Sequence, residues 1–294
     1  MRLNAVLTIL GCCAMLLQAP ASAIISVSDD AGQPVLLKAP ARRIVSLSPH
    51  ATELLHAAGA GGFIVGVSEY SNYPPEAKHI PSIGSAMALD LERIISLKPD
   101  LVIAWNSGNS ATQVARLRAA GIPVFESEPR DFATVASSLE RLGLLADTVP
   151  VGNTAAAAFR QRLKTLEATY KNRPVVNVFY QVWQYPLMTV NDAHLVSAAI
   201  RLCGGKNVFG DLSQLAPTVS AEAVLKIDPE AIVAGQGEEQ DPFANWRAFQ
   251  KMKAVDRKNL FAINSDWMTR AGPRILDGTE LLCKDLEAAR SKRK

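Results

Sequence analysis

This chain of 294 residues lacks the short motifs that mark the common enzyme classes. It has no G-x-S-x-G nucleophile elbow, no phosphate-binding loop and no G-x-G-x-x-G after a strand, because the glycine-rich run 59–62 follows a helix and is interpreted as its end. Net charge is also nearly absent, at +3, of which the leader's only charged residue, Arg2, contributes one. This balance does not favour nucleic acid, and the basic tail 290–294 is interpreted as a solvated end.

Long apolar runs are missing too, once the first residues are set aside. Beyond residue 23 no stretch approaches the ~20 apolar residues that span a bilayer. The start is typical of a signal peptide (1–23): Arg2, an apolar stretch over 5–17, and Ala-Ser-Ala ending at Ala23 as the cleavage site. A lipoprotein signal at Cys12 is the alternative, although its apolar core would be very short. We therefore expect export to the periplasm, cleavage near Ala23 and a soluble mature protein.

Cysteine is scarce in the mature chain. The sequence has four cysteines, and two of them, Cys12 and Cys13, leave with the leader. Cys203 and Cys283 remain, and in an oxidising compartment such an even pair most simply forms one disulfide, which would close a loop of about eighty residues. Two buried thiols are the alternative. Neither cysteine has a C-x-x-C spacing, which argues against a catalytic or metal-binding role.

What is present is a pattern that occurs twice in register, at 90–104 and at 220–234. Each copy begins with a residue that can cap a helix, Asp90 or Ser220, and continues with a short amphipathic turn that carries a glutamate near its start. A proline then ends the turn, and an apolar β-type run follows. One such unit could arise by chance, but two in register predict two similar lobes.

Strands alternate with helices on both sides of one long helix, after a hairpin over 24–37. The strands are expected at 43–47, 64–67, 101–105, 122–126, 175–181, 231–234 and 260–263, and the helices at 51–58, 113–119, 132–144, 195–202, 243–252 and 274–289. This alternation predicts an α/β fold with two Rossmann-like lobes, each built on a mainly parallel sheet covered on both faces.

The long helix is expected at 148–172, between an N-terminal lobe at 24–147 and a C-terminal lobe at 173–294. Apolar residues recur at helical spacing until the run 172–174, Asn-Arg-Pro, ends the pattern. About 22 helical residues would measure roughly 33 Å, the span of a small domain. A single rigid backbone helix of this length would join the lobes and permit only small relative motion.

Aromatic residues make up only 6% of the chain, yet three of the four tryptophans stand where strands are expected to end. Ligands of doubly wound sheets bind beyond the carboxyl ends of the strands. The stretches that fall there are 48–50, 68–71, 105–107, 181–185 and 265–267. They favour a cleft for a large, flat and partly apolar ligand. The alternative for each tryptophan is an ordinary lid over a core.

The histidines give little support to a metal site or an enzyme. His50 and His56 are six residues apart, on opposed faces of a helix, and His79 and His194 have no partners at ligand spacing. They are interpreted as surface or core histidines, except that His50 lies at a strand-to-helix turn and should face the cleft. Ser48 with His50 is the one hint of a hydrolase, and a separation of two residues is no sign of a triad.

Glu92 and Glu222 occupy equivalent positions in the duplicated units and should be exposed, one on each lobe. Such a pair would suit a molecule that docks onto a pseudo-symmetric partner through arginines. The alternative is stabilisation of the first helical turn, worth about 0.3 to 1 kcal/mol each.

Several stretches carry a resemblance that covers nearly the whole mature chain. They are Tyr-Ser-Asn-Tyr-Pro-Pro at 70–75, Leu-Glu-Arg-Ile at 91–94, 98–105, Cys-Gly-Gly at 203–205, Ser-Asp-Trp at 265–267 with Arg270, and Pro273-Arg274. Together they resemble the periplasmic cobalamin-binding proteins of bacterial ABC importers, within the wider group of metal-chelate receptors whose lobes are joined by one backbone helix. The Ser-Pro-x-x-Thr-Glu phrase at 48–53 is shared more broadly, with siderophore and haem receptors.

The resemblance implies a monomer, not an enzyme, that captures cobalamin or a related corrinoid as transported ligand, with no cofactor of its own, and delivers it to an inner-membrane ABC permease dimer. It implies that Glu92 and Glu222 grip permease arginines and that Cys203 and Cys283 form a disulfide. The positions that line the family's pocket are matched by Tyr70, Trp105, Asp266, Trp267 and Arg270.

The chain departs from the family at two positions. Ala86 and Ala216 stand where the well-studied cobalamin binders carry tryptophans. Their small side chains imply a roomier or differently shaped cleft, so haem or an iron chelate is the alternative ligand.

Overall fold

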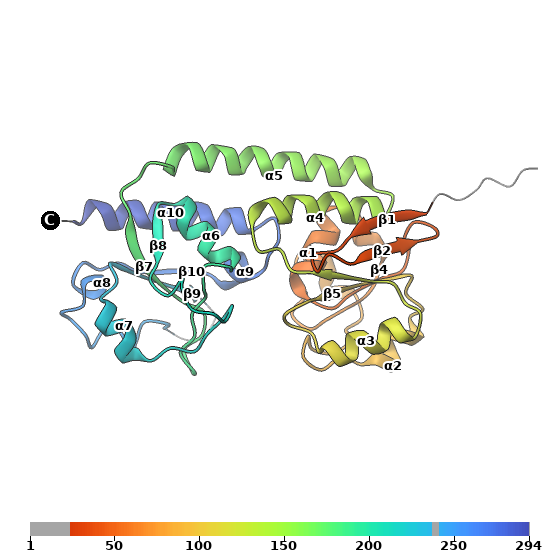
Figure 1. The fold of residues 1–294 in the computed structure, drawn as a ribbon, viewed down its shortest axis with the longest axis horizontal. Helices are drawn as coiled ribbons and strands as arrows, with labels where there is room; N and C mark the ends of the chain where they lie inside the picture. Colours follow the sequence, from red (N-terminus) through yellow and green to blue (C-terminus); the bar gives the residue numbers. More distant parts are fainter. Residues whose placement is uncertain (1–23, 237–240, 294) are drawn as a thin grey trace, which may run out of the picture.

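Two lobes lie side by side along the long axis of the molecule, and helix α5 (Val149–Tyr170) runs along both of them (Figure 1). The structure is a computed structural model that describes residues 24–236 and 241–293. It confirms the predicted α/β class, with two lobes of parallel strands. Among the helices in these ranges, none has the length and apolar character needed to cross a bilayer.

The N-terminal lobe starts with an antiparallel hairpin and continues as a parallel sheet in the order β4-β3-β5-β6. Its strands are β1 (Ile25–Ser28), β2 (Pro34–Leu37), β3 (Ile44–Ser46), β4 (Ile64–Val67), β5 (Leu101–Trp105) and β6 (Val124–Ser127). Its helices are α1 (Pro49–Ala57), α2 (Leu91–Ser96), α3 (Ala111–Ala119) and α4 (Phe132–Leu145), with 3-10 turns η1 (Gly61–Phe63) and η2 (Pro75–His79). The central strand β5 is almost wholly apolar because helices cover both faces of the sheet.

The C-terminal lobe repeats this architecture with a parallel sheet in the order β10-β9-β7-β8. Its strands are β7 (Val176–Gln181), β8 (Gly205–Asn207), β9 (Ala231–Gln236) and β10 (Leu260–Asn264). Its helices are α6 (Leu195–Leu202), α7 (Ala221–Ile227), α8 (Lys253–Asp256), α9 (Ser265–Thr269) and α10 (Ile275–Ser291).

The prediction of a helix at 243–252 is wrong, because the structure forms a series of turns over this stretch. The carboxylate of Asp241 accepts the backbone N–H of Phe243, and the indole N–H of Trp246 donates to Gln181 Oε1 at 2.7 Å. These anchors bury Phe243 and Trp246 without a helix. The sequence analysis also missed the edge strand β8 and the short helix α9 directly after β10.

The duplicated units form the same structure in each lobe: α2 leads into β5, and α7 leads into β9. Both strands are interior strands of their sheets. The residue before each proline, Lys98 or Asp228, has a left-handed backbone, with φ of 49° and 52°. This shared and uncommon conformation ends both helices and turns the chain into the strand.

Helix α5 is fixed to both lobes along its length. On the N-terminal side it packs closely on α4, since a Cβ at Gly152 would lie 2.6 Å from the carbonyl oxygen of Leu139. On the C-terminal side Arg162 pairs with Asp277 and Glu280 of α10, at 2.6 and 3.0 Å. One apolar cluster runs from the N-terminal sheet through α5 to the C-terminal sheet. The lobes therefore share a continuous core behind the cleft.

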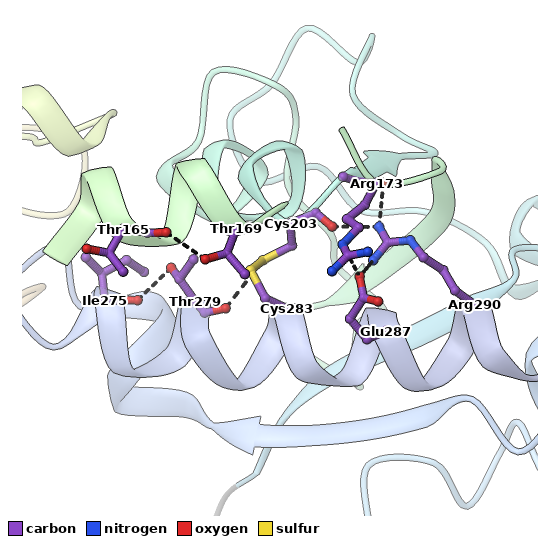
Figure 2. Close-up of a disulfide and its surroundings, with 10 residues drawn as sticks. Thr165, Thr169, Arg173, Cys203, Ile275, Thr279, Cys283, Glu287 and Arg290 are labelled. Atoms are coloured by element: carbon purple, nitrogen blue, oxygen red, sulfur yellow. Dashed lines mark hydrogen bonds and ion pairs between the residues drawn. A yellow bond between two sulfur atoms is a disulfide. The ribbon is translucent and has the colours of Figure 1, made fainter. Parts of the chain in front are cut away.

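One disulfide joins Cys203, at the end of α6, to Cys283 in α10, as the sequence predicts (Figure 2). The surroundings hold the same junction by hydrogen bonds. Arg290 Nη2 donates to the carbonyl oxygens of Cys203 and Gly204, at 2.6 and 3.0 Å, and its Nη1 pairs with Glu287 at 2.6 Å (Figure 2). The last helix is thereby tied to the edge of the C-terminal sheet.

Candidate functional site

A cavity of about 310 Å³ lies between the lobes, where the carboxyl ends of β3, β5, β6 and β10 meet. The N-terminal lobe lines it with Pro49, His50, Tyr70, Trp105, Glu128 and Arg130. The C-terminal lobe lines it with His194, Leu195, Leu215, Asp266, Met268 and Arg270. The position agrees with the rule that open α/β sheets bind ligands beyond the ends of their strands.

The structure brings together five of the six residues that the sequence nominates as ligand contacts: His50, Tyr70, Trp105, Asp266 and Arg270. The sixth, Trp267, is outside the lining of this cavity. It belongs to α9 rather than to a strand end, and its Cβ lies against Gly278 of α10, where an added Cβ would be 3.2 Å away. The part that each residue has in binding stays a prediction.

Three ionisable lining residues escaped the sequence reading: Glu128, Arg130 and His194. The first two directly follow β6, so the strand-end rule could have found them. His194 instead precedes α6, and only the packing of the two lobes brings it to the cavity.

His50 is a buried, neutral member of the N-terminal wall. Its Nε2 lies 3.2 Å from Ser127 Oγ, and its ring meets the Trp105 ring edge to face at 5.8 Å. Burial lowers the pKa of His50 to about 4, so the ring is uncharged at pH 7. Ser48 Oγ accepts the backbone N–H of Ala51 and caps α1. Ser48 therefore caps the helix, and the hydrogen-bond partner of His50 is Ser127. The pairing of Ser48 with His50 that suggested a hydrolase is not formed.

Large aromatic rings stand exposed at the strand ends. Tyr70 is 78% exposed and has a left-handed backbone, with φ of 64°. Beyond the end of β7, Trp183 and Tyr185 are 61% and 65% exposed. Hydrogen bonds hold this second pair: Trp183 Nε1 donates to the carbonyl oxygen of Tyr185 at 2.9 Å, and Asn245 Nδ2 donates to the Tyr185 hydroxyl at 2.7 Å. Ordered, exposed aromatic surface of this kind is typical of a binding site.

A buried charge cluster links the two lobes beside the cavity, which two of its members, Arg270 and Asp266, also line. Glu53 of α1 is bonded by two arginines that follow α9: Arg270 Nη1 lies 3.0 Å from Glu53 Oε1, and Arg274 binds both carboxylate oxygens, at 2.5 and 2.9 Å. Arg270 also pairs with Asp266 at 2.8 Å. Two positive and two negative side chains therefore compensate one another, and burial is tolerated because every charge is paired.

Glu92 and Glu222 are both exposed at the second residue of a helix, α2 or α7. These helices lie on the side of the molecule away from α5, one in each lobe (Figure 1). A hydrogen bond to its own backbone N–H, followed by one to Ser220, lowers the pKa of Glu222. Within residues 24–236 and 241–293 neither glutamate has an ion-pair partner, so both remain open to one from outside.

The two alanines at which the sequence departs from the cobalamin binders it resembles, Ala86 and Ala216, do not line the cavity. Ala216 is exposed and follows Leu215, which does line it. Ala86 is half-buried, and its carbonyl oxygen accepts Asn109 Nδ2 at 2.8 Å. In the described part of the chain no cluster of three histidine, cysteine or carboxylate residues is arranged to hold a metal ion.

Comparison with known proteins gives a consistent result. The sequence profile described as "Periplasmic binding protein" matches residues 44–267. A vitamin B12-binding protein of Vibrio cholerae serotype O1 is 38% identical over 245 residues, which are 82% of this chain and 87% of that protein. The crystal structure of the periplasmic vitamin B12 binding protein of Vibrio cholerae superposes with a TM-score of 0.80 at 39% identity, covering 85% of this chain and 98% of that one. A periplasmic heme-binding protein from Roseiflexus, at 23% identity and a TM-score of 0.74, shares the fold alone.

Proposed function

The chain belongs to the periplasmic binding protein family, and we propose that it captures cobalamin or a related corrinoid between its lobes for an ABC importer. It is a binding protein and not an enzyme, and the corrinoid is its cargo rather than a cofactor. The observation that carries the ligand class is the 38% identity to vitamin B12-binding proteins over 82% of the chain, together with a cleft whose walls carry Tyr70 and Trp105.

The chemistry of the cleft suits a corrinoid. A corrin ring offers a broad, partly apolar face and a rim of amide groups, which matches aromatic walls with a few hydrogen-bonding side chains. A corrinoid is larger than the 310 Å³ cavity, so part of it extends past Tyr70, whose ring is largely exposed. Because the lobes share a core and the Glu53 cluster, binding proceeds with small lobe motion.

A fluorescence titration of the purified protein with cyanocobalamin tests the proposal. Trp105 lines the cavity, so bound corrinoid should quench its emission, with saturation at micromolar ligand or below. The same titration on Trp105→Phe separates this signal from the other tryptophans. Absence of saturable quenching and of binding by calorimetry would overturn the proposal.

Haem is the second candidate ligand, favoured by the small side chains of Ala86 and Ala216. Visible spectra separate the two, since haem has a Soret band that corrinoids lack. Protein purified from its native host with a Soret band, and without affinity for cobalamin, would establish haem instead.

Delivery requires an inner-membrane permease, and Glu92 and Glu222 are our candidates for the contact. Their equivalent places on two lobes suit a permease dimer that presents one arginine from each half. As a monomer, the protein would present one pair of these glutamates to the permease dimer. The family places the protein in the periplasm, while cleavage near Ala23 lies outside the described residues and remains our proposal.

A further inference from the structure

One positively charged side chain that lines the cleft, Arg130, forms no ion pair with the described residues. The four charged residues that line the cleft are Arg130, Arg270, Glu128 and Asp266. Arg270 is occupied by Glu53 and Asp266, and Glu128 Oε2 accepts the backbone N–H of Ser107 at 2.8 Å. Arg130 is exposed and makes no side-chain hydrogen bond or ion pair to residues 24–236 or 241–293. An arginine that lines a binding cleft without forming an ion pair is available to a ligand anion.

A neutral hydrogen-bond donor lines the same cavity from the opposite lobe. His194 Nδ1 accepts the backbone N–H of Val196 at 3.1 Å, as the cap of α6. The proton of the neutral ring is therefore on Nε2, which can donate. Burial, and then the positive charge of Arg130, lower the pKa of His194 to about 4, so the ring is uncharged at pH 7. Both side chains line the same cavity, Arg130 from the N-terminal lobe and His194 from the C-terminal lobe.

We infer that Arg130 and His194 together bind an oxyanion of the ligand, the phosphodiester in the nucleotide tail of cobalamin. The inference rests on the proposed function. Cobalamin carries its one peripheral negative charge on this phosphodiester, while its other side chains are neutral amides. A guanidinium can bind two phosphate oxygens at once, and an imidazole N–H can bind one of them. With one group on each lobe, the phosphate fixes the orientation of the corrinoid in the cleft.

Cobinamide provides the test, because it is a corrinoid that lacks the phosphate and the nucleotide. Affinities for cobalamin and cobinamide are measured by calorimetry at pH 7 for the unsubstituted protein and for Arg130→Gln. Charged hydrogen bonds of this kind are worth roughly tenfold to a hundredfold in affinity. We expect Arg130→Gln to weaken cobalamin by this factor and to leave cobinamide within about twofold.

Two further variants complete the design. Arg116→Gln removes the same charge from an exposed position on α3, outside the cavity, and should leave both affinities unchanged. His194→Leu should also weaken cobalamin binding and leave cobinamide binding unchanged; a melting curve checks the fold of this variant, since α6 loses a cap.

If Arg130→Gln changes the affinities for both corrinoids equally, or changes neither, the inference is overturned while the proposed function stands. Failure of the unsubstituted protein to bind either corrinoid overturns both, and haem binding weakened by Arg130→Gln would assign the site to propionate carboxylates instead.

Discussion

Glu53 and Arg270 are 217 residues apart in the sequence and form a buried ion pair that joins the two lobes. The carboxylate is 2% exposed and the guanidinium 9%. Arg274 binds the same carboxylate and stacks on the ring of Tyr73 at 3.8 Å from its centroid. Since α5 fixes the lobes from behind, this cluster is a second link between them at the cleft, and it limits how far the cleft can open.

The first prediction concerns this link. Glu53→Gln keeps the size of the side chain and leaves Arg270 and Arg274 without their shared carboxylate. Removing one partner of a buried pair costs about 3–5 kcal/mol, so the urea midpoint should fall accordingly. Glu140→Gln is the matched control, because its pair with Arg160 lies at the surface and is worth about 0–1 kcal/mol. Equal effects of the two substitutions would show that the buried cluster does not stabilise the lobes.

The second prediction concerns the disulfide. Cys203→Ala with Cys283→Ala should lower the free energy of unfolding by about 4–5 kcal/mol, because the bond closes a loop across a sequence separation of 80 in the unfolded chain. Denaturant melts with and without a reductant measure this. Reductant should destabilise the unsubstituted protein and leave the double variant unaffected; a reductant-insensitive unsubstituted protein would contradict the prediction.

The third prediction is a dependence of stability on pH. His50 and His194 have pKa values near 4 when folded, against 6.5 when unfolded. As the pH falls from 7 towards 4 the unfolded chain gains these protons first, so the folded state loses stability over that interval and the loss is complete below pH 4. Each histidine accounts for roughly 1–2 kcal/mol between pH 7 and pH 5.

Denaturant melts of His50→Asn and of the unsubstituted protein at both pH values measure this contribution. The variant should show a smaller loss between pH 7 and pH 5, whatever its stability at pH 7. An identical loss in the two proteins would mean that His50 is protonated in the folded state.

The fourth prediction separates docking from ligand capture. Glu92→Arg combined with Glu222→Arg should abolish corrinoid transport in reconstituted vesicles, since two like charges would face the permease arginines. Ligand affinity should be unchanged, because neither residue lines the cavity. Glu167→Arg on the exposed side of α5 is the control and should transport normally. Normal transport by the double variant would remove the docking role.

The fifth prediction concerns Tyr70. Its ring is mostly exposed in the free protein, so Tyr70→Ala should change the free energy of unfolding by less than about 0.5 kcal/mol. Bound ligand would cover the ring, and its loss should weaken cobalamin binding by roughly tenfold. Calorimetry and a denaturant melt on the same preparation measure both quantities. A loss of stability without a loss of affinity would assign Tyr70 to the fold instead.

The duplicated units show how much of the fold could be predicted from local pattern. Caps, a proline and a buried apolar strand are short-range features, and they placed α2, β5, α7 and β9 correctly. The stretch 243–252 was predicted wrongly because its buried residues use long-range partners, such as Gln181 for Trp246, in place of a helix. Local periodicity carries no information about such partners.

The sequence by itself determined the class, the two lobes and the long helix, because each depends on residues close in the chain, and it favoured the disulfide because a single cysteine pair remains after the leader. The tertiary structure alone decided that His194 faces the same cavity as Arg130, that Trp267 packs on α10, and that Glu53 of the first lobe is paired with Arg270 and Arg274. The contact of Trp267 lies within the C-terminal lobe, whereas the other two relationships join residues from different lobes. Those two are set by how the shared core orients one sheet against the other, which no local pattern encodes.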